Sequence, residues 1–259
     1  MIFVTNDDGI ESQGLNTLAQ ALQPIDDVYV VAPDRERSAV GMAITLQHPL
    51  RAKQLEDFVY SVDGTPVDCV DLAVSALLPE RPKLLVSGFN HGQNLGQDIH
   101  FSGTVAAAKK GTFLGIPSIA ISITRGSPYH YEAAGAVASL LAKDVLKNGL
   151  PAGILLNVNV PNCPLSKIKG LEATRQDLGA YSADSIKRVD RMGEAYYWIG
   201  GERTQVDRRK DTDLNVVKQQ FVSVTPIQLD FTAHDEINPL SLWLKDANLE
   251  AVETNIDIR

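Results

Sequence analysis

The chain of 259 residues has few cysteines and lacks any long apolar run. Its two cysteines, Cys69 and Cys163, are too few for a disulfide framework or a cysteine-based metal cluster, so we expect both to be reduced, packed thiols. No apolar stretch approaches the ~20 residues needed to cross a bilayer, and no basic leader precedes the first apolar run. The sequence therefore predicts a cytoplasmic protein that does not bind a membrane.

Positive charge is also scarce. The 24 Lys and Arg residues are outnumbered by 32 Asp and Glu residues, which gives a formal net charge of -8. This surplus disfavours binding to nucleic-acid polymers or anionic lipid, and a small anion would need a local cation in order to bind. Hydrophobic residues make up 44% and charged residues 22%, which is typical of a globular chain rather than a disordered one.

Several familiar motifs of phosphate binding and nucleophilic catalysis are absent. The sequence contains no Walker A motif, no G-x-G-x-x-G after a predicted strand and no G-x-S-x-G elbow. The contiguous pair Asp7-Asp8 differs from the D-x-D motif of haloacid dehalogenase phosphatases and metal-dependent glycosyltransferases. The histidines are scattered. His91 and His100 fall near the polar loops discussed below, but a lone histidine is more often a packing or surface residue.

Apolar runs alternate with helical patterns along the first part of the chain. Leu15, Leu18 and Leu22 have the spacing of one buried helix face. Continuous apolar runs are typical of parallel strands that are covered on both faces, and they occur at residues 28–32, 83–87, 118–122 and 154–160. Further helices are expected to begin near residues 65 and 102 and to span residues 131–147. This alternation predicts an α/β fold in which a mostly parallel sheet lies between helical layers.

The character of the sequence changes at about residue 165, where it becomes more polar and less periodic. Residues 196–199 and 221–224 are the clear strand candidates in this part. We interpret residues 1–164 as the core domain and residues 165–259 as an appended β-rich region that packs on it. Long excursions of this kind often exchange between subunits, so we expect an oligomer.

Oxygen-bearing side chains follow three predicted strands, at the point where each strand ends. Asp7 and Asp8 come after the first apolar run, Ser38 follows the second, and Asn90 follows the third. An isolated Asn-Asp-Asp-Gly sequence is usually a solvated turn, but the carboxyl ends of parallel strands meet where α/β proteins bind ligands. Oxygen donors suit Mg²⁺ or Mn²⁺, whereas zinc would normally recruit His or Cys. A divalent cation would also neutralise the repulsion between adjacent carboxylates.

A candidate anion site lies at the start of a predicted helix. Ser102, Gly103 and Thr104 open an alanine-rich helix, and the free N–H groups and the dipole at a helix N-terminus favour negative charge. Asn94 stands in a glycine-rich loop and can donate to a phosphoryl oxygen. The alternatives are an ordinary N-cap for Ser102 and an Asx-turn for Asn94. A cation site beside an anion site suggests phosphate chemistry.

Five motifs occur in order along the chain, at residues 4–10 (VTNDDGI), 32–39 (APDRERSA), 64–66 (GTP), 86–96 (VSGFNHGQNLG) and 102–108 (SGTVAAA). This ordered set resembles the SurE family of stationary-phase survival proteins, which are 5′/3′-nucleotidases. The runs at 196–198 and 222–226 also resemble later strands of the family, so the similarity extends along the whole chain. The resemblance implies a three-layer α/β/α, Rossmann-like domain and a C-terminal region exchanged between subunits in a homodimer or homotetramer.

The resemblance also implies an activity and a set of site residues. The activity is metal-dependent hydrolysis of nucleoside 5′-monophosphates, and also of 3′-monophosphates, to nucleoside and phosphate. One divalent cation per subunit, Mg²⁺ or Mn²⁺, would be bound by Asp7, Asp8, Ser38 and Asn90. The phosphate would be held by Asn94, Ser102, Gly103 and Thr104. One departure from the family pattern is Phe101, at a position where a Tyr or another polar ring is common.

Our hypothesis for catalysis assigns a role to each of four residues. Asp7 or Asp8 orients or deprotonates the attacking water, while Asn94 and Ser102 stabilise charge on the phosphoryl oxygens. A rival mechanism makes one Asp a nucleophile that forms an aspartyl-phosphate. The competing functions are a non-catalytic nucleotide sensor that uses the same metal site, a short-chain polyphosphatase, and a metal-dependent transferase that handles nucleotide sugars.

Overall fold

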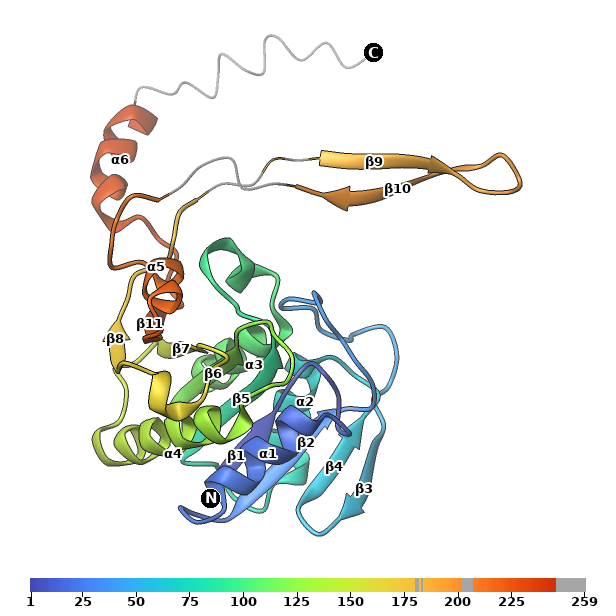
Figure 1. The fold of residues 1–259 in the computed structure, drawn as a ribbon, viewed down its shortest axis with the longest axis vertical. Coiled ribbons are helices and arrows are strands. Elements are labelled where there is room, and N and C mark those ends of the chain that lie inside the picture. The colour runs from blue at the N-terminus through green and yellow to red at the C-terminus, as the bar shows by residue number, and fades with distance from the viewer. Residues whose placement is uncertain (180–181, 183, 202–206, 246–259) are drawn as a thin grey trace. The chain divides into compact units, whose positions relative to one another are not determined.

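The computed structural model describes residues 1–179, 182, 184–201 and 207–245, and its centre is a nine-stranded sheet (Figure 1). The strands of this sheet are β1 (Ile2–Thr5), β2 (Val28–Pro33), β3 (Ala52–Glu56), β4 (Val59–Val62), β5 (Leu84–His91), β6 (Ser118–Ile123), β7 (Ile154–Val160), β8 (Leu171–Ala173) and β11 (Val222–Gln228). Their order is β3-β4-β2-β1-β5-β6-β7-β11-β8. The hairpin β3–β4 and the pair β7–β11 are antiparallel, and the other neighbouring pairs are parallel. The predicted mostly parallel sheet is therefore confirmed.

Helices cover both faces of the sheet. They are α1 (Gln13–Leu22), α2 (Pro66–Leu72), α3 (Gly103–Phe113), α4 (Tyr131–Asn148) and the short α5 (Asp213–Lys218). Helices α1 and α4 pack together on one face, and α2 and α3 pack together on the other (Figure 1). The three-layer α/β/α arrangement follows from this pairing.

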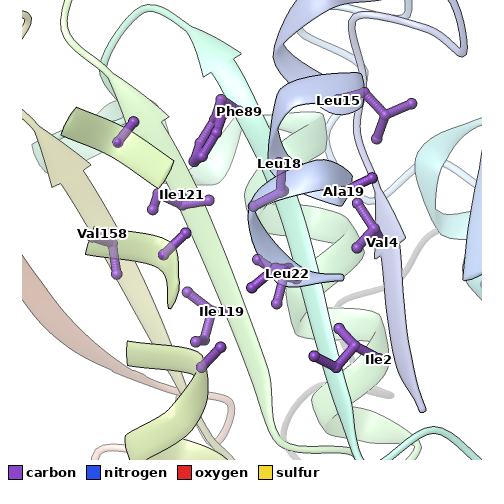
Figure 2. Packing of buried hydrophobic residues seen from close by; sticks show 14 of the residues in the cluster. Ile2, Val4, Leu15, Leu18, Ala19, Leu22, Phe89, Ile119, Ile121 and Val158 are labelled. Carbon is purple, nitrogen blue, oxygen red and sulfur yellow. The ribbon is translucent and has the colours of Figure 1, made fainter. Parts of the chain in front are cut away.

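The central strands β2, β1, β5, β6 and β7 contribute alternate side chains to two separate apolar cores. Ile2 and Val4 of β1 belong to the core beneath α1 and α4, whereas Phe3 belongs to the core beneath α2 and α3. This alternation explains why the strands read as continuous apolar runs, since both faces of the sheet are buried. Figure 2 shows the first core, where Leu18 of α1 and Ile121 of β6 point into the same apolar layer.

The start of α2 follows the predicted capping pattern. The Thr65 hydroxyl accepts a hydrogen bond from the Asp68 N–H at 3.1 Å, and the Asp68 carboxylate accepts one from the Thr65 N–H at 2.8 Å. Pro66 occupies the first turn, where its missing N–H costs no hydrogen bond. These reciprocal bonds satisfy two N–H groups at the helix end and fix where the helix begins.

Strand β5 is longer than its apolar run predicts. We expected the strand to end near residue 87 and Asn90 to lie in a loop, but β5 continues to His91 beside β6, and Asn90 pairs with Ser122. The register shifts between Ser87 and Asn90. At Gly88 (φ +147°) an added Cβ would lie 2.2 Å from the Ile121 carbonyl oxygen. The glycine that suggested a loop instead permits close approach of two strands.

The chain after residue 164 contributes β8 and β11 to the nine-stranded sheet. The separate antiparallel hairpin of β9 (Asp184–Val189) and β10 (Ala195–Gly200) is exposed throughout. The structure divides into two units, Met1–Leu229 and Asp230–Arg259. The second unit contains helix α6 (Ile237–Lys245). The predicted boundary at residue 164 stays a prediction, and residues 180–181, 183, 202–206 and 246–259 of the predicted C-terminal region lie outside the described residues.

Two further expectations concern the cysteines and the membrane. Cys69 is buried, Cys163 is half-buried, and neither forms a disulfide. Burial raises the pKa of the Cys69 thiol. Among the described residues, no helix combines the length and the apolar character that a membrane span requires.

Leu18→Ala tests the core beneath α1 and α4. Leu18 is fully buried, so we expect the substitution to lower the free energy of unfolding by about 2–5 kcal/mol, measured by urea denaturation. The matched control is Leu140→Ala on α4, where the side chain is 48% exposed and the loss should stay within about 0.5 kcal/mol. Equal losses in the two variants would contradict this assignment of the core.

Candidate active site

A cleft of about 760 Å³ opens where β1, β2 and β5 end. All four residues predicted to bind a cation contribute to its lining: Asp7, Asp8, Ser38 and Asn90. Two of the predicted phosphate-binding residues, Asn94 and Ser102, also line it. The structure therefore brings together residues that are up to 95 positions apart in the chain (Asp7 to Ser102). Strand ends meeting at one edge of the sheet account for this convergence.

The turn after β1 is fixed by its own side chains and by the next loop. The Asn6 carboxamide donates to the Gly9 carbonyl at 3.0 Å, and the Arg37 N–H donates to the Asp7 carbonyl at 2.7 Å. Gly9 has φ +98°, and a Cβ there would lie 2.9 Å from the Arg35 carbonyl carbon. Only glycine fits this turn without strain. The backbone that carries Asp7 and Asp8 is thus held tightly against the loop after β2.

Asp7 is a buried carboxylate at the base of the cleft. Its side chain is accessible over only a few per cent of its surface, and Oδ1 accepts a hydrogen bond from the Thr104 hydroxyl. Burial raises the pKa of Asp7 to about 6, although the Thr104 bond opposes the rise. The adjacent Asp8 carboxylate adds to it by repulsion. Asp7 therefore lies where a nearby cation would strongly stabilise its ionised form.

Asp8 lies beside Asp7 and has a buried oxygen without a hydrogen bond. Its Oδ2 makes no hydrogen bond among the described residues, and the His91 Nδ1 lies 3.6 Å from it. Burial lowers the pKa of His91, which favours the uncharged ring. Burial raises the pKa of Asp8 to about 6, and repulsion from Glu36 contributes to the rise. Buried polar atoms without a hydrogen bond are rare in native proteins, and a bound cation would give this oxygen a partner.

Ser38 and Asn90 complete the oxygen donors around the two carboxylates. The Ser38 hydroxyl donates to the Glu36 carboxylate at 2.7 Å, which leaves the lone pairs of its oxygen available. The Asn90 carboxamide donates through Nδ2 to the Gly92 carbonyl at 2.6 Å, so its Oδ1 remains an acceptor.

The donor set fits a hard divalent cation. It consists of two carboxylates, one hydroxyl and one carboxamide, and the buried Asp8 Oδ2 has no other partner among the described residues. Such oxygen ligands suit Mg²⁺ or Mn²⁺. The described residues contain no group of three or more His, Cys, Asp or Glu side chains arranged to hold a metal.

The N-terminus of α3 packs directly against Asp7 at the cleft. Ser102 is the N-cap, and its hydroxyl accepts the Val105 N–H at 3.1 Å. Gly103 allows the helix to approach Asp7 closely, since a Cβ there would lie 2.8 Å from the Asp7 Cβ. Thr104 is fully buried and its hydroxyl is occupied by Asp7. Only Ser102 of these three residues lines the cleft, so Gly103 and Thr104 can bind a ligand only through their backbone N–H groups.

Asn94 is held by a set of buried polar side chains. Its carboxamide donates to the Ser122 hydroxyl at 2.9 Å, and its backbone N–H donates to the Asn159 carboxamide at 2.8 Å. Its carbonyl accepts from Asn157 at 2.8 Å and from Asn159 at 3.0 Å. The Asn94 side chain therefore lies in one fixed orientation at the cleft wall, with one of its two amide hydrogens committed to Ser122.

Sequence reasoning missed several residues of the cleft lining. Glu36, Phe101 and Arg125 line it, and His91, which was considered only as a lone histidine, lies against Asp8. The His91 Nε2 is 2.6 Å from the Tyr131 hydroxyl. Arg125 follows β6, so the rule that located the other strand ends could have located it as well. It supplies the local cation that a net-negative chain needs in order to bind an anion.

Comparisons with known proteins agree with the motifs and the geometry. The family described as Survival protein SurE matches residues 2–183. The 5′-nucleotidase SurE of Pelobacter propionicus is 47% identical over 244 residues, covering 94% of this chain and 99% of that protein. The 5′-nucleotidase SurE of Geobacter sulfurreducens is 48% identical over 243 residues, covering 93% of each. The crystal structure of the SurE protein from Aquifex aeolicus has a TM-score of 0.85 and 41% sequence identity, covering 95% of this chain and 99% of that one. The chain belongs to the SurE family.

Proposed function

We propose that this protein is a metal-dependent nucleotidase that hydrolyses nucleoside 5′-monophosphates, and also 3′-monophosphates, to nucleoside and phosphate. The observation that carries the proposal is the buried Asp8 Oδ2, which makes no hydrogen bond among the described residues, beside Asp7 and the N-terminus of α3. An oxygen-rich cation site facing an anion site is what hydrolysis of a phosphate ester requires. The names of the relatives, 5′-nucleotidase SurE, support the same activity.

The proposed ligands of a single Mg²⁺ or Mn²⁺ are Asp7, Asp8, Ser38 and Asn90. Bound there, the cation would polarise a phosphoryl oxygen and lower the pKa of the attacking water. The two carboxylates have different tasks in this proposal. Asp7 is fixed by Thr104 and serves as a rigid ligand. Asp8 has the unpaired Oδ2 and is the better placed of the two to orient the water and accept its proton.

The phosphate group would be bound by the start of α3 and by the loop that carries Asn94. The Ser102 side chain, the N–H groups at the start of α3 and the second amide hydrogen of Asn94 are the donors in this proposal. They act on the charge that develops on the phosphoryl oxygens in the transition state. Arg125 adds a positive charge at the cleft wall. Because Asn94 is locked by Ser122 and Asn159, it would pay little reorganisation during the reaction.

Phe101 gives the cleft an apolar surface for the nucleoside base. Its ring lines the cleft directly before Ser102, and 64% of its surface is exposed. The backbone beneath it is anchored, because its carbonyl accepts the Gly41 N–H at 3.0 Å and its N–H donates to the Asp98 carbonyl at 3.1 Å. A base stacked on such a ring gains about 1–3 kcal/mol regardless of its identity. The proposal therefore includes tolerance for several bases.

Restoring metal to the chelator-treated protein should raise its midpoint of thermal unfolding. We expect a rise of about 5–10 °C at a hundredfold excess of Mn²⁺ over its Kd, together with phosphate release from nucleoside monophosphates. Asp8→Asn should abolish the thermal shift and lower the hydrolysis rate by about 10²–10³-fold, because it removes the unpaired oxygen.

The matched control is Asp71→Asn, because Asp71 pairs with Lys110 on the surface and lies outside the cleft. It should leave both the thermal shift and the rate unchanged. A thermal shift without phosphate release from any monophosphate would refute the nucleotidase and favour a nucleotide sensor. Preferential release from short polyphosphates would favour the polyphosphatase.

Phe101→Ala should raise KM for nucleoside monophosphates about fivefold or more, because it removes the stacking surface. Ribose 5-phosphate has no base, so its KM should not change in the variant. Steady-state kinetics with both substrates measures the difference. Phe113→Ala removes another exposed ring, at the end of α3, and serves as the control. An equal rise in KM for both substrates would contradict base stacking on Phe101.

The subunits are proposed to form a homodimer or homotetramer by exchange of C-terminal elements. The hairpin β9–β10 supports this, because large apolar side chains are exposed on it, including Ile186, Val189, Tyr197, Trp198 and Ile199. An isolated two-stranded hairpin with an uncovered apolar surface is marginally stable in water. A second copy of this chain would cover it.

Ile199→Asp should weaken this association, since Ile199 is 94% exposed in the single chain and a charge would be buried in the interface. Sedimentation equilibrium should show a mass closer to one subunit for the variant than for the unchanged protein. Leu140→Asp on the exposed face of α4 is the control and should keep the original mass. An unchanged protein that stays monomeric at micromolar concentration would contradict the proposal.

A further inference from the structure

Asp213 is a buried carboxylate that belongs to none of the predicted site residues. It is the first residue of the short helix α5, far along the chain from the cleft, and its side chain is fully buried. It does not line the cleft. A buried carboxylate is costly unless hydrogen bonds satisfy it, so the partners of Asp213 show what it stabilises.

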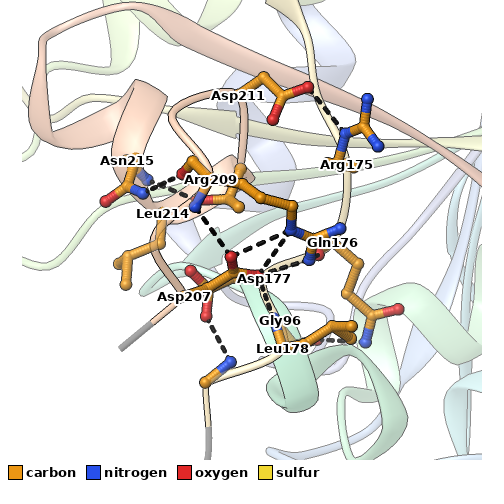
Figure 3. Close-up of polar contacts among 12 residues, drawn as sticks. Gly96, Arg175, Gln176, Asp177, Leu178, Asp207, Arg209, Asp211, Leu214 and Asn215 are labelled. Atoms are coloured by element: carbon orange, nitrogen blue, oxygen red, sulfur yellow. Dashed lines mark hydrogen bonds and ion pairs between the residues drawn. The ribbon is translucent and has the colours of Figure 1, made fainter. Parts of the chain in front are cut away.

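The two oxygens of Asp213 bind different parts of the structure. Oδ1 accepts from the N–H groups of Asp177 at 3.1 Å and of Leu214 at 2.7 Å, both in the C-terminal part of the chain. Oδ2 accepts from the Gly96 N–H at 2.8 Å, across 117 positions of sequence. Burial raises the pKa of Asp213, and these three bonds oppose the rise. Figure 3 shows the surrounding cluster of polar contacts, in which Gly96 lies next to Asp177.

Gly96 is held by this segment on several sides. The Gln176 carboxamide donates to the Gly96 carbonyl at 2.9 Å, so both backbone polar groups of Gly96 bind the same part of the chain. Gly96 has φ +54°, and an added Cβ would lie 3.0 Å from the Asp177 carbonyl oxygen. The backbone around Gly96 is therefore pressed against residues 176–177 at a position where a side chain would not fit easily.

The segment is itself braced by surrounding contacts. Arg209 donates to the Gln176 carbonyl at 3.1 Å, and Asp207 accepts the Leu178 N–H at 3.1 Å (Figure 3). The Asp213 N–H donates to the Arg175 carbonyl at 2.9 Å. Residues 175–178 therefore form a stiff support rather than a flexible loop that would follow any movement of Gly96.

Gly96 lies between the two phosphate-binding residues of the cleft. Asn94 is two positions before it, and the 3₁₀ turn Gly96–His100 begins at Gly96 and leads directly to Ser102. The Asp98 carbonyl of this turn accepts the Phe101 and Ser102 N–H groups, each at 3.1 Å. A shift of Gly96 would therefore move Ser102 through one short hydrogen-bonded turn, and Asn94 through two peptide units.

We propose that Asp213 is a positioning residue, which sets the separation of Asn94 and Ser102 across the phosphate site through its Oδ2 bond to Gly96. The inference rests on the proposed nucleotidase function. The sheet holds the Asn94 end of this loop through Asn157 and Asn159. The C-terminal part of the chain holds Gly96 through Asp213. Asn94 lies at the first of these anchor points, and Ser102 follows the turn that begins at the second. A shift of about 1 Å in such donors is enough to lower a rate about a hundredfold.

Asp213→Asn tests the inference selectively. The Asn oxygen can still accept from Asp177 and Leu214, but the amide nitrogen then replaces Oδ2 and offers Gly96 no acceptor. We expect kcat for a nucleoside monophosphate to fall about ten- to hundredfold. Backbone amide exchange of residues 94–102, followed by mass spectrometry, should become faster. The Mn²⁺-induced thermal shift should not change, because the proposed cation ligands lie outside this contact.

The matched control is Asp211→Asn, four positions after Asp207 in the same segment, where an exposed carboxylate pairs with Arg175. This variant should leave kcat and the backbone amide exchange of residues 94–102 unchanged. Gln176→Ala removes the other bond to Gly96 and should reproduce both effects at a smaller size, which keeps the test valid if Asp213→Asn does not fold. A lower unfolding midpoint with kcat within twofold of the unchanged enzyme would reduce Asp213 to a structural residue and overturn the proposal.

The two proposals can fail separately. If the unchanged protein releases no phosphate from any monophosphate, the nucleotidase proposal fails. Asp213 is then tested by amide exchange of residues 94–102 and by the thermal shift that inorganic phosphate produces in the presence of Mn²⁺. Both should be altered in Asp213→Asn if Asp213 positions the phosphate donors, and unchanged exchange with an unchanged phosphate shift would overturn that role.

Discussion

The burial of Asp7 beside Asp8 is the constraint on which the rest of the site depends. Both carboxylates lose solvation at the end of a buried strand, which raises the pKa of each to about 6, and repulsion from Asp8 on Asp7 and from Glu36 on Asp8 adds to the rise. A structure tolerates such an arrangement only where other groups offset it. Thr104 provides one hydrogen bond to Asp7, yet the Asp8 Oδ2 stays unpaired among the described residues. The fold thus keeps a carboxylate pair that a cation would stabilise more than its own polar groups do.

Close packing around that pair explains why small residues surround it. Gly103 lets the N-terminus of α3 approach the Asp7 side chain, and Gly9 lets the turn after β1 pass the Arg35 backbone. The positive end of the helix dipole is thereby brought directly beside the carboxylate of Asp7. A side chain at either glycine would push these segments apart, and the favourable electrostatic interaction would weaken with distance.

Much of the fold and of this site could be predicted from the sequence, for one physical reason. Strands buried on both faces read as apolar runs, and the rule that parallel strands end at one edge placed Asp7, Ser38 and Asn90 in the same cleft. The same reasoning failed at β5, because Gly88 marks a close approach of strands rather than a loop. It also did not predict the bond between the Thr104 hydroxyl and Asp7, which depends on how closely a helix approaches a strand. The contact of Asp213 with Gly96 could not be predicted from the sequence, because residues 117 positions apart form no local sequence pattern.

The connection through Asp213 changes how the part of the chain after residue 164 should be understood. Residues 175–178 and α5 supply hydrogen bonds to the loop that carries the proposed phosphate donors, while β8 and β11 extend the central sheet. Because the sheet asparagines fix one end of that loop and Asp213 fixes the other, its geometry depends on both parts of the fold being correctly packed. Helix α5, which carries Asp213, ends three residues before β11, the strand that pairs with β7 in the central sheet. The appended region is in this sense a structural component of the site, and the physical route of that dependence is a short series of hydrogen bonds.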